Sequence, residues 1–186
     1  MPIRIVDLDP EDTAQREQAA RLLFRSFREL TPSWPTIESA RSEVAESLAP
    51  GRISRVMLAA GRVVGWVGAQ PHYEGHVWEI HPLVVEEVER GKGYGRALIR
   101  DLETLVAERG ALTLWVGTDD ERDATTLSGV DLYEDTLGAI AGVRNLARHP
   151  YEFYQRLGFR IVGVLPDANG PGKPDIFLAK RVAVDS

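Results

Sequence analysis

A glycine-rich segment between residues 90 and 96 has the composition of an anion-binding loop. It reads RGKGYGR, and it separates an apolar, β-branched run at 77–85 from apolar residues spaced three and four apart at 94–109. This pattern predicts a strand over 77–85, a turn over 86–95 and a helix from 94 to about 109. The free N–H groups of a helix that opens after such a turn, aligned with its dipole, hold phosphate or pyrophosphate.

Several loops with different partners share this general design. A P-loop requires Ser or Thr after its lysine, but Gly93 follows Lys92. A dinucleotide-binding turn requires a third small residue where Arg96 stands. The remaining pattern, R-x-x-G-x-G from Arg90 to Gly95, resembles the acetyl-coenzyme A loop of the GCN5-related N-acetyltransferases (the GNAT superfamily). An ordinary strand-to-helix turn is the alternative at this point.

The order of the predicted elements supports the resemblance. Strands and helices are expected in the order β-α-α-β-β-β-α-β-α-β-β, with helices over 10–30 and 36–48 and a hairpin over 54–70. Residues 151–159, YEFYQRLGF, also resemble the later GNAT motif, a helix-to-strand junction. The expected fold class is therefore α+β (α/β three-layer): one GNAT domain over 1–186, with a mixed, mostly antiparallel central sheet flanked by helices.

The resemblance implies acetyl-CoA as cofactor and direct transfer of its acetyl group to an amine. Backbone amides of the glycine loop would hold the pyrophosphate, and the N–H of Val84 or Val85 would stabilise the oxyanion. Asn145 and Arg148 could contact the cofactor, although a solvated helix cap explains them equally well. The cofactor-binding residues expected are Leu83, Val84, Val85, Arg90, Gly91, Lys92, Gly93, Tyr94, Gly95, Arg96, Asn145 and Tyr154.

Acetyl transfer also needs a base for the amine and an acid for the thiolate. Period-two alternation places Glu79, His81, Leu83 and Val85 on one face of the strand. Glu79 occupies the place of the glutamate in the histone-acetylating branch, whereas His81 titrates near neutral pH, so the base is left open between them or a water relay. Tyr154 matches the GNAT tyrosine that protonates the thiolate.

Composition excludes several other classes of protein. With 44% hydrophobic and 27% charged residues the chain is typical of a globular protein. Because it has no cysteine, it has no disulfide, thiolate metal site or cysteine nucleophile. A net charge of −6 argues against a nucleic-acid partner. We found no membrane span or signal peptide pattern, so a cytoplasmic location is expected, and a homodimer is plausible.

Residues 119–135 carry seven acidic side chains against the single base Arg122. Such a loop is either a solvated surface or an attractor for a small polycation. The stretches VWEIHPLVV, LWVGTDDE and HPYEFYQRLGFRIVGVLPDANGPGKPDI are similar to aminoglycoside 6'-N-acetyltransferases, which implies an aminoglycoside substrate and antibiotic resistance. The substrate-binding candidates are Trp34, Tyr73, Glu79, Asp119, Asp120, Glu134, Asp135 and Asp175.

Two alternatives to this substrate are kept. Within the same enzyme class, the acceptor could be a polyamine, a small metabolite amine or a peptide amine. In a different class, the chain could be a non-catalytic CoA-binding sensor, although such a sensor would not require Glu79 and Tyr154.

Overall fold

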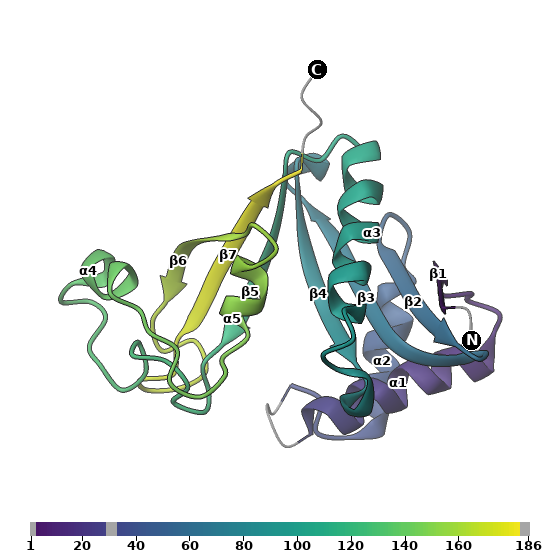
Figure 1. The fold of residues 1–186 in the computed structure, drawn as a ribbon, viewed down its shortest axis with the longest axis horizontal. Coiled ribbons are helices and arrows are strands. Elements are labelled where there is room, and N and C mark those ends of the chain that lie inside the picture. The colour runs from purple at the N-terminus through teal and green to yellow at the C-terminus, as the bar shows by residue number, and fades with distance from the viewer. Residues whose placement is uncertain (1–2, 29–32, 183–186) are drawn as a thin grey trace. The chain divides into compact units, whose positions relative to one another are not determined.

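The computed structural model describes residues 3–28 and 33–182, in two compact units. The first unit spans Met1–Leu114 and Val182–Ser186, and the second spans Trp115–Arg181. The last two residues of the helix predicted over 10–30 lie outside the described residues. Figure 1 shows the helices and strands that make up each unit.

The first unit is built on antiparallel strands in the order β1-β2-β3-β4. Their bounds are β1 Ile3–Asp7, β2 Ile53–Ala59, β3 Arg62–His72 and β4 Val77–Val85. The expected hairpin is present, since β2 and β3 are joined at Ala60 and Gly61, whose φ angles are 53° and 76°. Glycine suits Gly61 because it has no Cβ to oppose a positive φ.

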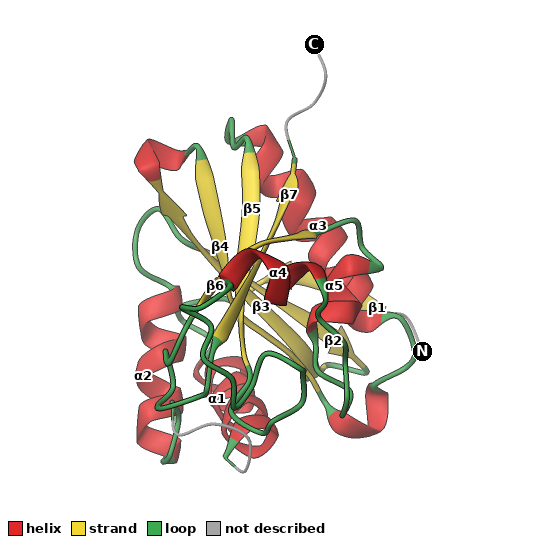
Figure 2. Ribbon diagram, turned by 90° about the vertical axis from the view of Figure 1, so that its left-hand side faces the viewer, coloured by secondary structure: helices red, strands yellow, loops and turns green. Residues whose placement is uncertain are grey.

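Helices cover both faces of this sheet (Figures 1 and 2): α1 (Thr13–Phe27) and α2 (Ile37–Ser47) lie on one face, and α3 (Tyr94–Glu108) lies on the other. The first two begin at capping residues. Asp12 accepts the N–H of Gln15 at 2.9 Å, and Thr36 forms a reciprocal capping box with Ser39. The predicted helix over 36–48 is therefore confirmed nearly to the residue.

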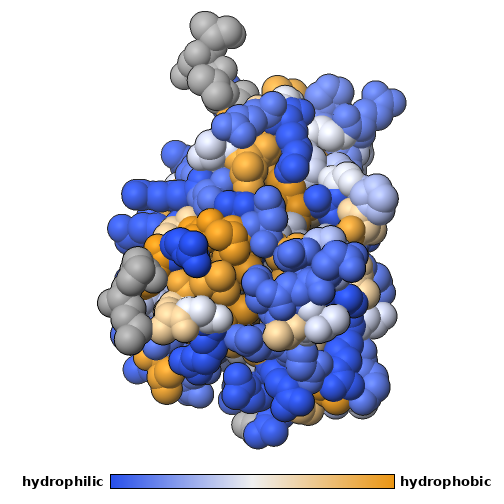
Figure 3. All heavy atoms as spheres, turned by 90° about the vertical axis from the view of Figure 1, so that its right-hand side faces the viewer, coloured by the Kyte–Doolittle hydropathy of each residue, from blue (hydrophilic) through white to orange (hydrophobic). Residues whose placement is uncertain are grey.

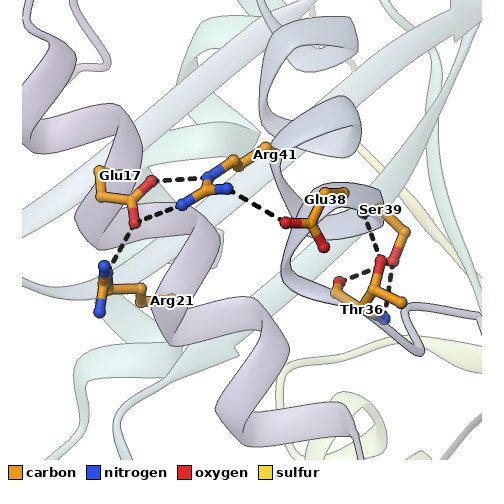
Figure 4. Close-up of polar contacts among 6 residues, drawn as sticks. All are labelled: Glu17, Arg21, Thr36, Glu38, Ser39 and Arg41. Carbon is orange, nitrogen blue, oxygen red and sulfur yellow. Dashed lines mark hydrogen bonds and ion pairs between the residues drawn. The ribbon is translucent and has the colours of Figure 1, made fainter.

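An ion pair joins α1 to α2 on their exposed sides (Figure 4). The guanidinium of Arg41 binds Glu17 twice, with Nε–Oε2 at 2.9 Å and Nη2–Oε1 at 3.0 Å, and Arg21 contacts the same carboxylate at 2.7 Å. Bidentate pairing fixes the relative orientation of the two planar groups. This contact helps to hold α2 in place, and α2 carries Glu43, a residue of the candidate site.

Apolar side chains of α1, α2 and the sheet form the core of the first unit. Trp66, fully buried at its centre, donates its indole N–H to Ser54 Oγ at 2.9 Å. The other buried members of the cluster are Leu8, Ala19, Ala20, Leu22, Leu23, Trp34, Ala40, Val44, Val56, Leu58, Val63 and Val84. On the opposite face, Gly65 leaves room for α3, since a Cβ there would lie 2.9 Å from Leu98 Cδ1.

The second unit contains three strands in the order β5-β7-β6. Its elements are β5 (Thr113–Asp119, which starts in the first unit), α4 (Thr136–Ala141), α5 (Tyr151–Gln155), β6 (Arg160–Leu165) and β7 (Asp175–Arg181). All three strands were expected from the sequence. The short helix α4 was not, because its six residues are too few to show a helical period.

Hydrophilic residues cover most of the face drawn in Figure 3, around a central hydrophobic area. Ile3, on the edge strand β1, is one of the large hydrophobic residues that stay partly exposed.

No helix in the described part of the chain is both long and apolar enough to cross a bilayer.

Candidate active site

The glycine loop connects β4 to α3 as predicted. The chain leaves β4 at Val85, forms the short 3-10 helix η2 (Glu87–Glu89) and enters α3 at Tyr94. Gly91 and Gly93 have φ angles of 80° and 85°, and Gly93 is the left-handed N-cap of α3. No side chain caps this helix, so its first N–H groups are left for an external acceptor. The residues present therefore fit a phosphate group.

Polar contacts hold the loop in this shape. Arg90 Nε donates to the carbonyl oxygen of Val85 at 3.2 Å, and Lys92 Nζ lies 2.8 Å from Glu89 Oε2. This hydrogen bond to Glu89 raises the pKa of Lys92. Arg90 and Lys92 thus both bond within the loop, and the side chains of Arg90, Lys92 and Arg96 are all exposed at its surface.

Strand β4 contains a bulge, which makes the predicted common face of Glu79, His81, Leu83 and Val85 wrong. The residues His81 and Pro82, joined by a cis peptide bond, lie opposite Gly68 alone. The register passes from Val67↔Leu83 to Ala69↔Ile80 across this point. An extra residue in one strand shifts every later side chain to the opposite face.

Contacts on either side of the bulge show the change of face. The His81 ring lies 5.7 Å from the Trp34 ring, and Val84 belongs to the same core cluster as Trp34, on the face of α1 and α2. Val85 pairs with Gly65, where α3 packs. The bulge therefore turns Val85 toward α3 and His81 toward α2.

Glu79 lies on the same face as His81, two residues earlier in β4. Its Oε2 accepts a hydrogen bond from Gln70 Nε2 at 2.7 Å and lies 2.9 Å from His72 Nε2. The side chain is 19% exposed, so the carboxylate is held in position and still reachable. Its Oε1 has no hydrogen bond to another described residue, which leaves an acceptor for an amine or a water.

His81 pairs with a residue that the sequence did not single out, Glu43 of α2. Its Nε2 lies 3.4 Å from Glu43 Oε2, and the same oxygen accepts the indole N–H of Trp34 at 3.1 Å. The hydrogen bond to Glu43 raises the pKa of His81, although burial opposes the change. Glu43 stands three residues after buried Ala40 and four before buried Ser47, so its place on the inner stripe of the helix was a usable signal.

Tyr154 lies in α5, in the second unit, and is 6% exposed. Its ring packs edge-on against Phe153 and Phe159, with centroids 5.1 and 5.5 Å away. Burial raises the pKa of the phenol well above its usual value. The hydroxyl makes no hydrogen bond to another described residue and stays protonated at neutral pH, as a proton donor requires.

Asp120 does not face solvent, which corrects its assignment as a substrate ligand. It is fully buried, and its carboxylate accepts the N–H groups of Ala124 (2.6 Å) and Thr125 (2.9 Å) and the Thr125 hydroxyl (2.7 Å). Asp120 therefore folds the start of the long connection back on itself.

Asn145 also has a local structural role. Its side-chain amide bonds both the N–H and the carbonyl oxygen of His149, at 2.8 and 2.9 Å. Buried His149 in turn contacts the carbonyl oxygen of Asp119 through Nε2 and accepts the N–H of Tyr151 through Nδ1. Burial lowers the pKa of His149, which keeps the ring neutral for this pair of contacts. The network fixes the first turn of α5, the helix of Tyr154.

The other predicted substrate ligands differ from one another in exposure and in hydrogen bonding. Tyr73 is 78% exposed in the short 3-10 helix η1 (Tyr73–Gly75), and Glu134 is also exposed. Asp119 Oδ1 accepts Asn169 Nδ2 at 2.7 Å, and Asp135 caps α4 through the N–H of Gly138 at 2.9 Å. Asp175 is half-buried at the start of β7.

The first unit thus carries the glycine loop where α3 begins and, on the face of α1 and α2, Glu79, His81 and Trp34, with Glu43 added by the structure. The second unit carries Tyr154 and the acidic segment. Comparison with known proteins identifies the class that these features define. Residues 17–139 match the acetyltransferase (GNAT) family. Since this match spans more than half of the chain, the chain belongs to that family, and it is an N-acetyltransferase that uses acetyl-CoA.

Solved structures give a closer comparison. A crystal structure of aminoglycoside 6'-N-acetyltransferase complexed with coenzyme A is 42% identical, with a TM-score of 0.92, over 98% of this chain and 99% of that one. The Enterococcus faecium aminoglycoside 6'-N-acetyltransferase is 42% identical (TM-score 0.89), with the same coverage. Aminoglycoside 6'-acetyltransferase type Ii is 35% identical (TM-score 0.77), again over 98% and 99%. These similarities confirm the predicted fold class. Comparison with curated proteins gave no match.

Proposed function

We propose that this chain transfers the acetyl group of acetyl-CoA to the 6'-amine of aminoglycosides. The observation that carries the proposal is the 42% identity, over nearly the whole chain, to two solved aminoglycoside 6'-N-acetyltransferases. The acidic balance of 119–135 supports it, because carboxylates attract a substrate with several ammonium groups. The chain acts as a single domain over 1–186.

Holding the cofactor is assigned to the first unit. The uncapped N-terminus of α3 and the exposed Gly91 and Gly93 let a pyrophosphate approach the backbone closely. Arg90 and Arg96 supply positive charge, and Leu83 to Val85 would lie along the pantetheine arm. When bound, acetyl-CoA supplies an activated thioester whose carbonyl oxygen would accept the N–H of Val84 or Val85.

Proton transfers are assigned to two side chains, Glu79 and Tyr154. Glu79 is the proposed base, directly or through water, because His81 is held toward its charged form by Glu43 and is a poorer acceptor. Tyr154 donates a hydrogen bond, and finally its proton, to the leaving thiolate. Asp119, Glu134, Asp135 and Asp175, with Trp34 and Tyr73, are proposed to contact the drug. Resistance to aminoglycosides, action in the cytoplasm and a homodimeric state complete the proposal.

Replacing Gly93 with alanine tests the cofactor loop. An L residue at φ 85° costs roughly 1–2 kcal/mol, and a shift of the loop to relieve this strain should weaken coenzyme A binding about 10-fold, measured by isothermal titration calorimetry. Gly110→Ala is the matched control, since Gly110 has φ 81° and lies at the other end of α3, and a Cβ at either glycine would meet no atom within 4 Å. Equal coenzyme A affinities in both variants would contradict the assignment.

The function is tested by thiol release from acetyl-CoA with kanamycin, a 6'-hydroxyl aminoglycoside, spermidine and a basic peptide. The chain has no cysteine, so every thiol detected comes from the cofactor. Turnover with kanamycin that is lost with the 6'-hydroxyl compound is the expected result. Turnover only with spermidine or the peptide would replace the substrate, and no turnover with any amine would favour a CoA-binding sensor.

A further inference from the structure

Glu43 is an acidic residue in an unusual place. It lies on the inner stripe of α2, between buried Ala40 and Ser47, and its side chain is only 13% exposed. A carboxylate removed from water needs hydrogen-bonding or charged partners, because its desolvation is otherwise costly. Its partners therefore indicate what it does.

Both identified partners of Glu43 are candidate site residues. Oε2 accepts the Trp34 indole N–H at 3.1 Å and lies 3.4 Å from Nε2 of His81. The two rings are themselves in contact, with centroids 5.7 Å apart and planes inclined by 44°. Oε2 of Glu43 in α2 thus links Trp34, in the loop before α2, to His81, in the bulge of β4.

The charges around His81 favour its protonated form. Glu43 acts on it from α2 and Glu79 from β4, whereas Arg52, in the turn before β2, opposes them. Burial alone would raise the pKa of Glu43, but the hydrogen bonds from His81 and Trp34 outweigh it, and the pKa is lowered. The raised pKa of His81 and the lowered pKa of Glu43 both agree with an ion pair between the two side chains.

We propose that Glu43 is a positioning residue that holds His81 as an imidazolium beside Glu79 and locks Trp34 against the same ring. This inference rests on the proposed function. The imidazolium then cannot take the proton of the amine, so that task falls to Glu79, and Trp34 provides a fixed wall on this face of β4. Glu43 itself touches neither substrate nor cofactor.

The ion pair is tested by NMR titration of the imidazole nitrogens in the full chain. Among the signals of the four histidines, that of His81 is identified by its absence from a His81→Gln variant, and that of His149 by its absence from a His149→Gln variant. In Glu43→Gln the pKa of His81 should fall by about 1 pH unit or more, whereas the pKa of His149 should not change. Glu46→Gln is the matched control, since Glu46 is an exposed residue of the same helix. An unchanged His81 pKa in Glu43→Gln would overturn the proposal.

Positioning is tested by the pH profile of kcat/KM in the thiol assay. Glu43→Gln should lower kcat/KM, and the loss should be largest between the lowered pKa of His81 in the variant and its raised pKa in the wild type, because only in that pH range do the two enzymes differ in the charge beside Glu79. Glu43→Asp should recover part of the activity, and Glu46→Gln should match the wild type. A uniform loss at all pH values, with no recovery in Glu43→Asp, would indicate a merely structural role and overturn the proposal.

A separate variant guards against misfolding of Glu43→Gln. Trp34→Phe removes the indole N–H donor but leaves the carboxylate of Glu43, so the pKa of His81 should stay raised. A fall in the pKa of His81 in this variant would overturn the proposed ion pair between Glu43 and His81. Wild-type turnover with a polyamine or peptide but no aminoglycoside would overturn the proposed function alone. The NMR titration would still decide whether Glu43 pairs with His81. The pH profile of kcat/KM would then be measured with the amine that the enzyme acetylates.

Discussion

Tyr154→Phe is expected to lower kcat by about 10²-fold, the low end of what general acid catalysis contributes. The variant removes only the hydroxyl, and the phenylalanine ring keeps the edge-on contacts with Phe153 and Phe159. Affinity for acetyl-CoA and the free energy of unfolding should therefore stay close to those of the wild type. The measurement is thiol release at saturating acetyl-CoA and kanamycin, with calorimetric titration of coenzyme A.

Tyr151→Phe is the matched control for this prediction. Tyr151 lies in the same helix, is also buried, and loses the same single atom. Its kcat should be near that of the wild type. If both variants retain full kcat, Tyr154 is only a core aromatic residue, and the acid must be sought elsewhere.

Asp120→Ala should cost about 3 kcal/mol or more of the free energy of unfolding. Three donors, the N–H groups of Ala124 and Thr125 and the Thr125 hydroxyl, would lose their acceptor in a buried site. Each buried donor left unsatisfied costs roughly 1–3 kcal/mol. Chemical unfolding in urea, followed by tryptophan fluorescence, measures the loss.

The neighbouring residue supplies the control. Asp119 is exposed, and its carboxylate accepts a hydrogen bond from Asn169, so Asp119→Ala should cost about 1 kcal/mol or less. If Asp119 binds an ammonium group of the drug, this variant raises KM for kanamycin without lowering stability. Equal stability losses at the two positions would show that burial of Asp120 is not the deciding factor.

The glycine loop could be predicted because its signals are local. A left-handed backbone at Gly91 and Gly93 favours glycine through contacts within one or two residues. The helical spacing of the apolar residues of α3 is likewise visible within one continuous stretch of sequence. The bounds of α2, β4 and α3 were accurate for the same reason. Capping at Thr36 is likewise decided by the residues next to it.

The remaining features depend on pairing between distant segments. The face to which Val85 points follows from a bulge whose register is set against β3, so alternation within β4 alone predicted it wrongly. Asp120 and Asp119 are adjacent in an acidic run, yet only one of them is buried, because the chain folds back over it. Glu43 is separated from His81 by the whole of β2 and β3, and no local pattern joins them.

The sequence by itself therefore determined the family, the anion-binding loop and the types of residue available for proton transfer. These follow from short-range backbone preferences and from motifs whose residues are close in the chain. Only the tertiary structure decided which carboxylates are free and which are used: Glu79 is reachable, Glu43 is paired with His81, and Asp120 is buried among donors. The state of a carboxylate depends on burial and on the charges beside it, and both are products of contacts made after the chain has folded.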